Sequence, residues 1–144
     1  MFEIFATTPE DLGLAAIAAH AQRVEALGFD GLFVPDAVHD GMLMACMALA
    51  STQRIRVATS VLVAFPRSPM NVALAAWDLQ RMSGGRFELG LGTQIRQNIE
   101  ERYSARWLPP ASRRNIHEVK HTRGTGRGRP CDSCMRGRDD RPAR

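Results

Sequence analysis

Two groups of polar residues in this chain have the types and spacing that chemistry requires. Asp36, His39 and Asp40 stand within five positions of one another, directly after an apolar run. A histidine can polarise a group or carry a proton near pH 7, whereas an aspartate in such a loop is otherwise a helix cap or a turn residue. Thr93 and Gln94 follow a glycine-containing run and offer a hydroxyl and an amide. These side chains are the first candidates for a functional site.

A third set of polar side chains has the spacing of a zinc site. His117 and His121 are spaced H-x3-H, and Cys131 and Cys134 are spaced C-x2-C, so four ligands occur within eighteen residues. The order is the reverse of the usual finger, and the intervening TRGTGRGRP supplies no hydrophobic core that could fold around a metal. We therefore expect no metal site, and zinc binding by this segment stays an alternative.

Charge divides the chain into two segments. Residues 1–112 hold nine Arg and no Lys against eleven acids, whereas residues 113–144 hold ten Lys plus Arg against four acids and few large apolar residues. The second segment cannot offset the entropy of ordering, so we expect a domain over residues 1–110 and a disordered basic tail over 111–144. Such a tail could contact nucleic acid through phosphates, but residues 113–144 have no aromatic side chain for stacking on bases. Nucleic-acid binding is therefore the other disfavoured alternative.

The elements that position the first candidates follow a regular order. A short strand is expected over 2–6, and Thr8 with Pro9, Glu10 and Asp11 has the composition of a helix start. That helix should end at Gly28. The remaining pattern predicts strands over 31–34, 56–65 and 86–92 and helices over 42–52 and 69–83.

Strands and helices in alternation predict a parallel sheet with right-handed crossovers. A doubly wound nucleotide-binding sheet would need a G-x-G-x-x-G run after its first strand, but Gly90 and Gly92 lie in the fourth strand and Ile95 takes the third position. The fold class is therefore α/β, a partial (β/α)8 TIM-type barrel with about four units. In a barrel the chemistry lies at the carboxyl ends of the strands, where Thr93 and Gln94 stand. The glycines let either a packed barrel layer or a ligand ring approach closely.

Three segments carry a resemblance to a known family. EALGFDGLFVPD, RVATSVLVAFPRSP and LQRMSGGRFELGLGTQ together resemble the amino-terminal half of the luciferase-like monooxygenase family, particularly its F420-dependent oxidoreductases. The resemblance covers residues 1–110. It implies a (β/α)8 barrel that binds FMN or F420 at the carboxyl ends of its strands and acts on a small-molecule substrate.

The resemblance also implies roles for individual residues. Ser60 and Val61 match the place of a non-proline cis peptide that forms a bulge behind the central ring of the cofactor. Asp36 matches a position near cofactor and substrate, so Asp36 or His39 is the candidate for the proton step. Thr93, expected with Gln94 to contact the cofactor, stands where bacterial luciferases carry a phosphate-binding Arg, which favours a deazaflavin-type relative.

The resemblance implies an oxidoreductase that transfers a hydride or activates oxygen on reduced flavin. A complete barrel needs about 250 residues, so we expect a truncated enzyme of uncertain activity, its tail being similar in composition to an out-of-frame translation of a GC-rich gene. Open strands at 2–6 and 86–92 would expose unpaired edges, so we expect the isolated chain to be a homo-oligomer or poorly soluble, completion of the barrel by partner chains being one alternative. Without a signal peptide or an apolar run long enough to span a bilayer, the expected location is the cytoplasm.

Overall fold

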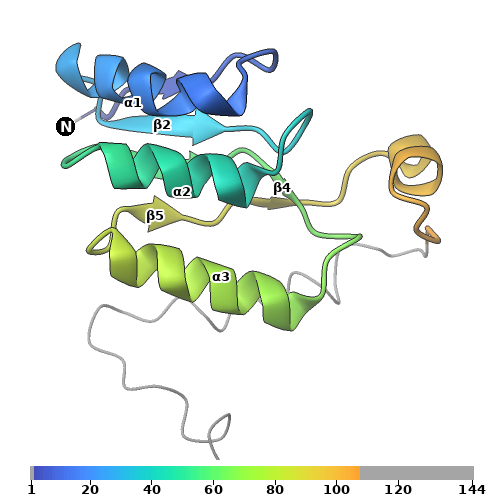
Figure 1. Cartoon of the computed structure of the whole chain (residues 1–144). Coiled ribbons are helices and arrows are strands. Elements are labelled where there is room, and N and C mark those ends of the chain that lie inside the picture. The colour runs from blue at the N-terminus through green and yellow to red at the C-terminus, as the bar shows by residue number, and fades with distance from the viewer. Residues whose placement is uncertain (1, 108–144) are drawn as a thin grey trace, which may run out of the picture.

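Strands and helices alternate along residues 2–107, the part of the chain that this computed structural model describes (Figure 1). The strands are β1 (Phe5–Thr7), β2 (Gly31–Val34), β3 (Arg56–Thr59), β4 (Leu62–Val63), β5 (Phe87–Glu88) and β6 (Leu91–Gly92). The helices are α1 (Ile17–Ala26), α2 (Gly41–Ser51) and α3 (Pro69–Met82), with short helical turns η1 (Leu14–Ala16) and η2 (Asn98–Arg102). The predicted alternation is confirmed.

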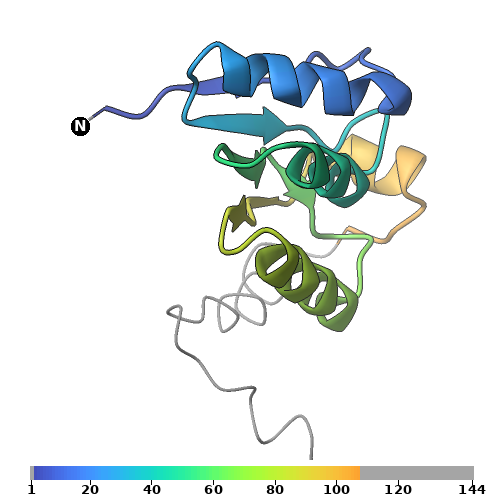
Figure 2. The same ribbon diagram turned by 60° about the vertical axis from the view of Figure 1, so that its left-hand side comes forward.

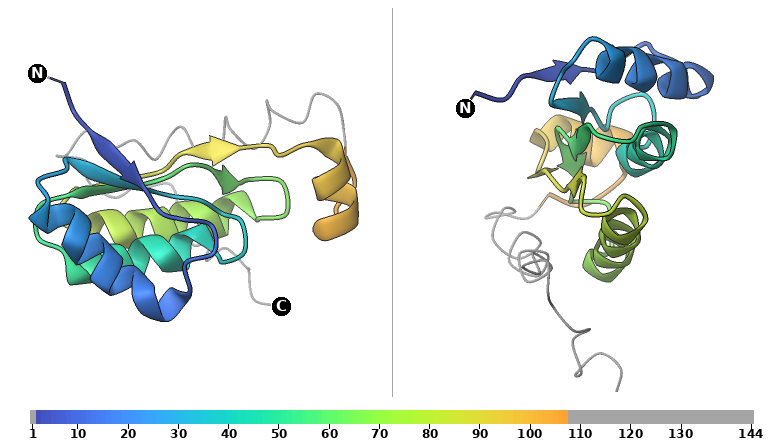
Figure 3. Two further views of the ribbon diagram at one scale, coloured as in Figure 1. Left: turned by 90° about the horizontal axis from the view of Figure 1, so that it is seen from above. Right: turned by 90° about the vertical axis from the view of Figure 1, so that its left-hand side faces the viewer.

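The strands form a four-stranded parallel sheet and a two-stranded parallel one. In the first sheet β1, β2, β3 and β5 are neighbours in that order, and in the second sheet β4 pairs in parallel with β6. The helices α1, α2 and α3 cover one face of the four-stranded sheet, as Figures 2 and 3 show from two sides. This is part of a (β/α)8 barrel, the predicted fold class. All the loops that follow the strands therefore gather at one end.

The core lies between the sheet and the three helices. Helix α1 contributes Ile17, Ala21 and Val24, and helix α2 contributes small residues such as Ala45 and Ala48, all at most 4% exposed. Alanines on the inner face of a helix let its backbone approach the sheet closely. Each large apolar side chain buried here stabilises the fold by roughly 1.5–3 kcal/mol. These side chains are Ile17, Val24, Leu32, Val34, Met44, Leu49, Ile55, Val57, Leu79 and Phe87.

The start of the first helix differs from the prediction. Thr8 was expected to cap a helix, but α1 begins at Ile17 after η1, and the Thr8 N–H donates to Phe33 O at 2.9 Å, which prolongs β1. Thr8 is 1% exposed. The pairing of an adjacent strand outweighed the local capping preference, because the Thr8 N–H gains a strand hydrogen bond even though its buried hydroxyl has no partner among the described residues. At the other end of the helix, Gly28 has the left-handed conformation that was expected, with φ +86°.

Two charged side chains hold the loop between α2 and β3, at the amino end of the sheet. The Glu25 carboxylate accepts from the N–H groups of Gln53, Arg54 and Ile55. The Arg86 guanidinium donates to the carbonyl oxygens of Leu49, Thr52, Ile55 and Ser83 at 3.0–3.1 Å. Backbone groups that no helix or strand pairs are thus satisfied by one anion and one cation.

Glu25 should make stability depend on pH. Burial opposes the charged form, but the three backbone N–H donors and Arg54 outweigh it and hold the pKa of Glu25 below its ordinary value of 4.5. The stabilisation is therefore complete above that ordinary value and is lost as the pH falls through the lower folded pKa. We expect the urea midpoint of Glu25→Gln to lie below that of the wild type at neutral pH and to approach it between about pH 5 and pH 3.

The matched control for this measurement is Glu10→Gln, at an exposed turn position. Its midpoint should follow the wild type at every pH. A constant difference between Glu25→Gln and the wild type across the acid range would contradict the assignment, because the carboxylate charge would then contribute nothing.

Two further properties concern residues 2–107 alone. No cluster of His, Cys, Asp or Glu in them has the composition of a metal site. None of their helices combines the length and the apolar character that crossing a membrane requires. The His117, His121, Cys131 and Cys134 set, and the predicted tail over 111–144, lie outside the described residues.

Candidate functional site

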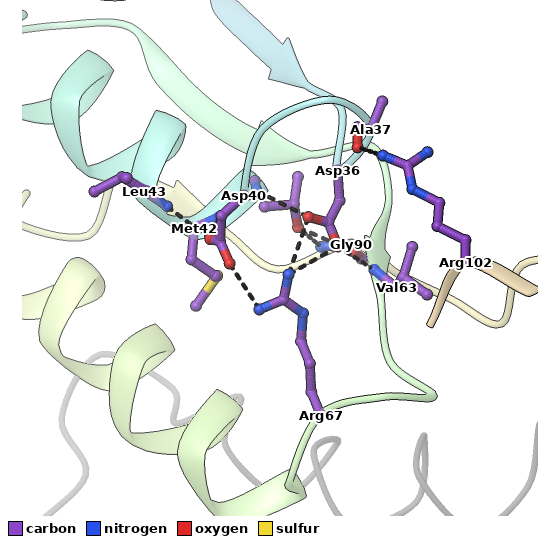
Figure 4. Close-up of polar contacts among 11 residues, drawn as sticks. Asp36, Ala37, Asp40, Met42, Leu43, Val63, Arg67, Gly90 and Arg102 are labelled. Carbon is purple, nitrogen blue, oxygen red and sulfur yellow. Dashed lines mark hydrogen bonds and ion pairs between the residues drawn. The ribbon is translucent and has the colours of Figure 1, made fainter. Parts of the chain in front are cut away.

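The loops that follow β2, β4 and β6 meet at the carboxyl end of the sheet. The β2–α2 loop, residues 35–40, carries Asp36, His39 and Asp40. The β4–α3 loop carries Arg67, and the segment after β6 carries Thr93 and Gln94. Figure 4 shows how the first two of these loops are joined by polar contacts.

The predicted cis peptide is present between Ser60 and Val61. It divides the predicted strand over 56–65 into β3 and β4. Val61 is 44% exposed and Ser60 is also exposed, while Thr59 and Leu62 on either side are buried. The Ser60 N–H donates to Val34 O at 2.8 Å, so the strand stays paired up to the break. The chain thus presents one exposed pair between two buried neighbours.

The predicted strand over 86–92 is also divided, into β5 and β6, and Gly90 between them and Gly92 in β6 pack against this break. A Cβ on Gly90 would lie 2.1 Å from Thr59 O, and a Cβ on Gly92 would lie 2.3 Å from Val61 Cγ2. The Thr59 hydroxyl donates to Gly90 O and accepts from Gly90 N, both at 2.9 Å. The sequence left open whether a packed barrel layer or a ligand ring approaches these glycines. In the structure, atoms of the neighbouring segment at Thr59 and Val61 do so.

Asp36 is buried, and its carboxylate is surrounded by donors (Figure 4). Oδ1 accepts from Gly41 N at 3.0 Å, and Oδ2 accepts from Val63 N at 2.9 Å. Arg67 Nη2 donates to both oxygens, at 3.0 and 3.1 Å. The carboxylate therefore connects the start of the β2–α2 loop to helix α2, to strand β4 and to the β4–α3 loop.

Asp40 lies at the other end of the same loop and caps helix α2. Its Oδ1 accepts from Met42 N and Leu43 N at 2.9 and 3.0 Å, and its Oδ2 accepts from Arg67 Nη1 at 2.9 Å. Burial opposes ionisation, but these backbone donors and Arg67 outweigh it and lower the pKa of Asp40. In the same way, burial opposes the charge of Arg67, but hydrogen bonds and attraction from Asp40 and Asp36 outweigh it and raise the pKa of Arg67.

His39 is half-buried between these two aspartates in the sequence. Within residues 2–107 its imidazole has no hydrogen-bond partner, which leaves both ring nitrogens available to a bound molecule. The structure thus places His39 on the same loop as Asp36 and gives the two side chains different environments.

Thr93 and Gln94 leave the sheet at the end of β6. Thr93 is half-buried, and Gln94 is exposed with a left-handed backbone, φ +63°. Gln94 Oε1 accepts from Ile95 N and from Asn98 Nδ2, both at 3.1 Å, so it organises the turn before η2. Contact of this pair with a cofactor stays a prediction.

Two arginines of this end were not among the sequence candidates. Arg67 joins both aspartates, and Arg102 of η2 donates to Ala37 O in the same loop (Figure 4). Arg67 could have been found, because it is the basic residue of a strand-to-helix loop that faces a neighbouring loop with two acids. Arg102 gave no such signal, since it reaches the loop across 65 positions.

Comparison with known proteins identifies the group to which this arrangement belongs. The family model described as luciferase-like monooxygenase matches residues 1–119. The chain belongs to the luciferase-like monooxygenase family. The predicted resemblance is confirmed. These comparisons do not support zinc binding or nucleic-acid binding as the function of this luciferase-like chain.

Relatives of this luciferase-like chain include proteins named for F420. An uncharacterised protein of Mycobacterium tuberculosis is 49% identical over 105 residues, covering 73% of this chain and 30% of that protein. The F420-dependent glucose-6-phosphate dehydrogenase of Intrasporangium calvum is 35% identical over 95 residues, covering 58% and 28%. The luciferase-like chain thus spans about three tenths of the length of these relatives.

The fold is shared with a solved oxygenase structure. The oxygenating constituent of 3,6-diketocamphane monooxygenase from Pseudomonas putida, in complex with FMN, superposes with a TM-score of 0.64 at 14% identity, covering 85% of this chain and 38% of that one. At this identity the likeness concerns the fold alone.

Two side chains at this end of the sheet have the chemistry to contact the ring of such a cofactor, one exposed and one half-buried. Val61 offers an exposed apolar side chain, and the free imidazole of His39 offers a donor or an acceptor. Arg67 and Arg102 are both committed to the β2–α2 loop. A hollow of about 420 Å³ also lies beside Arg67, but it is lined by residues where α2 and α3 begin and does not include the exposed pair. The exposed Ser60–Val61 pair thus lies outside this hollow.

Proposed function

We propose that this chain supplies the ring-binding part of an F420- or FMN-dependent oxidoreductase that acts on a small-molecule substrate. The observation that carries the proposal is the exposed Ser60–Val61 pair at the carboxyl end of the sheet, in a chain of the luciferase-like family. The cofactor, when bound, would accept or deliver a hydride, or activate oxygen if it is a reduced flavin. F420 is the preferred cofactor, because a relative at 35% identity is named for it.

The residues of the chain would divide the remaining work. Val61 and Ser60 would back the ring and exclude water from one of its faces, and Thr93 and Gln94 would border it. His39 would hold or move the proton, because its ring nitrogens are free within the described residues and an imidazole can both donate and accept. Asp36 would hold the loop that carries His39, since its oxygens already accept four hydrogen bonds.

The proposal is tested by titrating the full chain with F420 and with FMN and following cofactor fluorescence. We expect Val61→Asp to weaken cofactor binding by about tenfold or more, since the ring would have to desolvate a carboxylate. Leu27→Asp is the matched control, because Leu27 is also an exposed apolar residue, at 70% against 44% for Val61, and lies at the amino end of the sheet.

The circular dichroism spectrum and the melting temperature show whether each variant is folded. Equal cofactor affinity of the wild type and Val61→Asp would contradict the proposal that the cofactor ring lies against Val61. Failure of the wild type to bind either cofactor would overturn the proposal for this chain.

Association of the chain with itself stays a prediction. β1 and β5 are the outer strands of the four-stranded sheet among the described residues. Light scattering of the purified chain would report a dimer or larger species if these edges pair, and a monomer if they do not.

A further inference from the structure

We propose that Arg67 is a positioning residue of this site, which fixes the β2–α2 loop against β4 and thereby sets where His39 stands. The inference deepens the proposed function and rests on it for its consequence in binding. Its structural part stands on the contacts of Arg67 alone.

The first step is that Arg67 closes the loop on itself. Its Nη2 binds Asp36 at the start of the loop, and its Nη1 binds Asp40 at the end of it, at 2.9–3.1 Å. His39 lies between the two carboxylates in the sequence. A planar guanidinium can hold two carboxylates with separate nitrogens, whereas a lysine is a single point charge that cannot reproduce this geometry.

The second step is that Asp36 transmits this position to the strand. Asp36 Oδ2 accepts from Val63 N, two residues beyond the exposed Val61. On the other side, Oδ1 accepts from Gly41 N, and a Cβ on Gly41 would lie 3.2 Å from Asp36 Cβ. The carboxylate is therefore packed between the start of α2 and β4, and a shift of the loop would have to break one of these bonds.

The third step concerns charge and burial. The side chain of Asp36 is 4% exposed and that of Arg67 is 26% exposed. Without Arg67 the buried carboxylate would keep only two backbone N–H donors, which is a costly state for a charge. The loop would relieve this by moving Asp36 toward water, away from Val63. Arg102, which binds Ala37 O, would still hold the middle of the loop and would not hold its two ends.

The fourth step separates positioning from general stability. The main core lies between the sheet and the helices, and the α2–β3 loop at the amino end has its own anchors in Glu25 and Arg86. Removal of Arg67 should therefore loosen residues 35–40 and leave the central strands protected. This selectivity is what an experiment can detect.

The experiment compares the full chain with Arg67→Met, Arg67→Lys and Arg81→Met. Arg81 is an exposed arginine at the end of α3 and serves as the control. The first readout is amide hydrogen exchange without cofactor. We expect Arg67→Met to accelerate exchange at Gly41 and Val63 by about tenfold or more and to leave Val57 in the central strand unchanged.

The second readout is F420 affinity, measured by fluorescence as above. We expect a loss of about tenfold in Arg67→Met, an intermediate value in Arg67→Lys and no change in Arg81→Met. Asp40→Asn keeps the helix cap and weakens only the outer ion pair, so it replaces Arg67→Met if that variant does not fold.

The outcomes separate the two proposals. Uniformly faster exchange, including Val57, would overturn positioning, because Arg67 would then serve global stability. Unchanged exchange at Gly41 and Val63 would overturn it as well. If the wild type binds no cofactor while Arg67→Met loosens only the loop, the proposed function fails and the positioning role stands. If the wild type and Arg67→Met bind F420 equally, the function stands and the role of Arg67 in binding fails.

Discussion

Replacing Arg86 with methionine should lower the free energy of unfolding by about 3 kcal/mol or more. Methionine keeps much of the length and the apolar stem of the side chain, so the loss reflects the guanidinium. That group donates to the carbonyl oxygens of Leu49, Thr52 and Ile55, which mark the end of α2 and the loop into β3. Each carbonyl would lose a charge-assisted partner in a part-buried place where water replaces it poorly.

Urea unfolding followed by circular dichroism measures this effect. Arg86→Lys should lie between methionine and wild type, because an ammonium can satisfy some of the carbonyls. Arg23→Met, at an exposed position in the last turn of α1, should change stability by less than about 0.5 kcal/mol. A wild-type midpoint for Arg86→Met would show that the loop carbonyls find other partners at no cost.

Gly90→Ala should cost about 3 kcal/mol, although it adds a single methyl group. The added Cβ would lie 2.1 Å from Thr59 O, which belongs to the backbone of the adjacent strand. A backbone oxygen cannot rotate away as a flexible side chain would. The strands would have to separate, and the two hydrogen bonds between Thr59 Oγ1 and the Gly90 backbone would lengthen or break.

Gly13→Ala is the matched control for this substitution. A Cβ at Gly13 has no atom within 4 Å, and its backbone has an ordinary φ of −63°. Its melting temperature should stay equal to or slightly above that of the wild type, since alanine restricts the unfolded chain more than glycine does. Similar melting temperatures for both alanine variants would mean that the sheet accommodates the methyl group at Gly90.

Much of the fold could be predicted from local sequence. The apolar run from Gly31 to Val34 is a strand with the predicted bounds, because an uninterrupted buried run leaves little choice of structure. The break at Ser60 and Val61 came from the family resemblance, since no residue in RVATSVLVAF signals it. Thr8 failed as a helix start because its partner Phe33 lies 25 positions away, beyond the reach of a local pattern.

The sequence predicted which residues lie at the candidate site better than it predicted the hydrogen bonds and ion pairs between them. Asp36 and His39 do share a loop at the carboxyl end, as the topology required. What sequence alone could not supply was the partner of each carboxylate. Asp36 and Arg67 are 31 positions apart, and their contact depends on how the β2–α2 and β4–α3 loops are positioned relative to each other. When its partners are unknown, a polar side chain looks available for catalysis. In the structure, the Asp36 carboxylate already accepts four hydrogen bonds.

The anchoring of the sheet at both ends has a further consequence for how the chain tolerates change. Glu25 and Arg86 hold the amino end, and Asp36 with Arg67 holds the carboxyl end, with no residue common to the two sets. Substitutions that share no partner usually have additive effects on the unfolding free energy. Substitutions in the carboxyl-end loops should therefore leave the stabilisation supplied by the amino end unchanged, so the two ends can be altered independently in engineering.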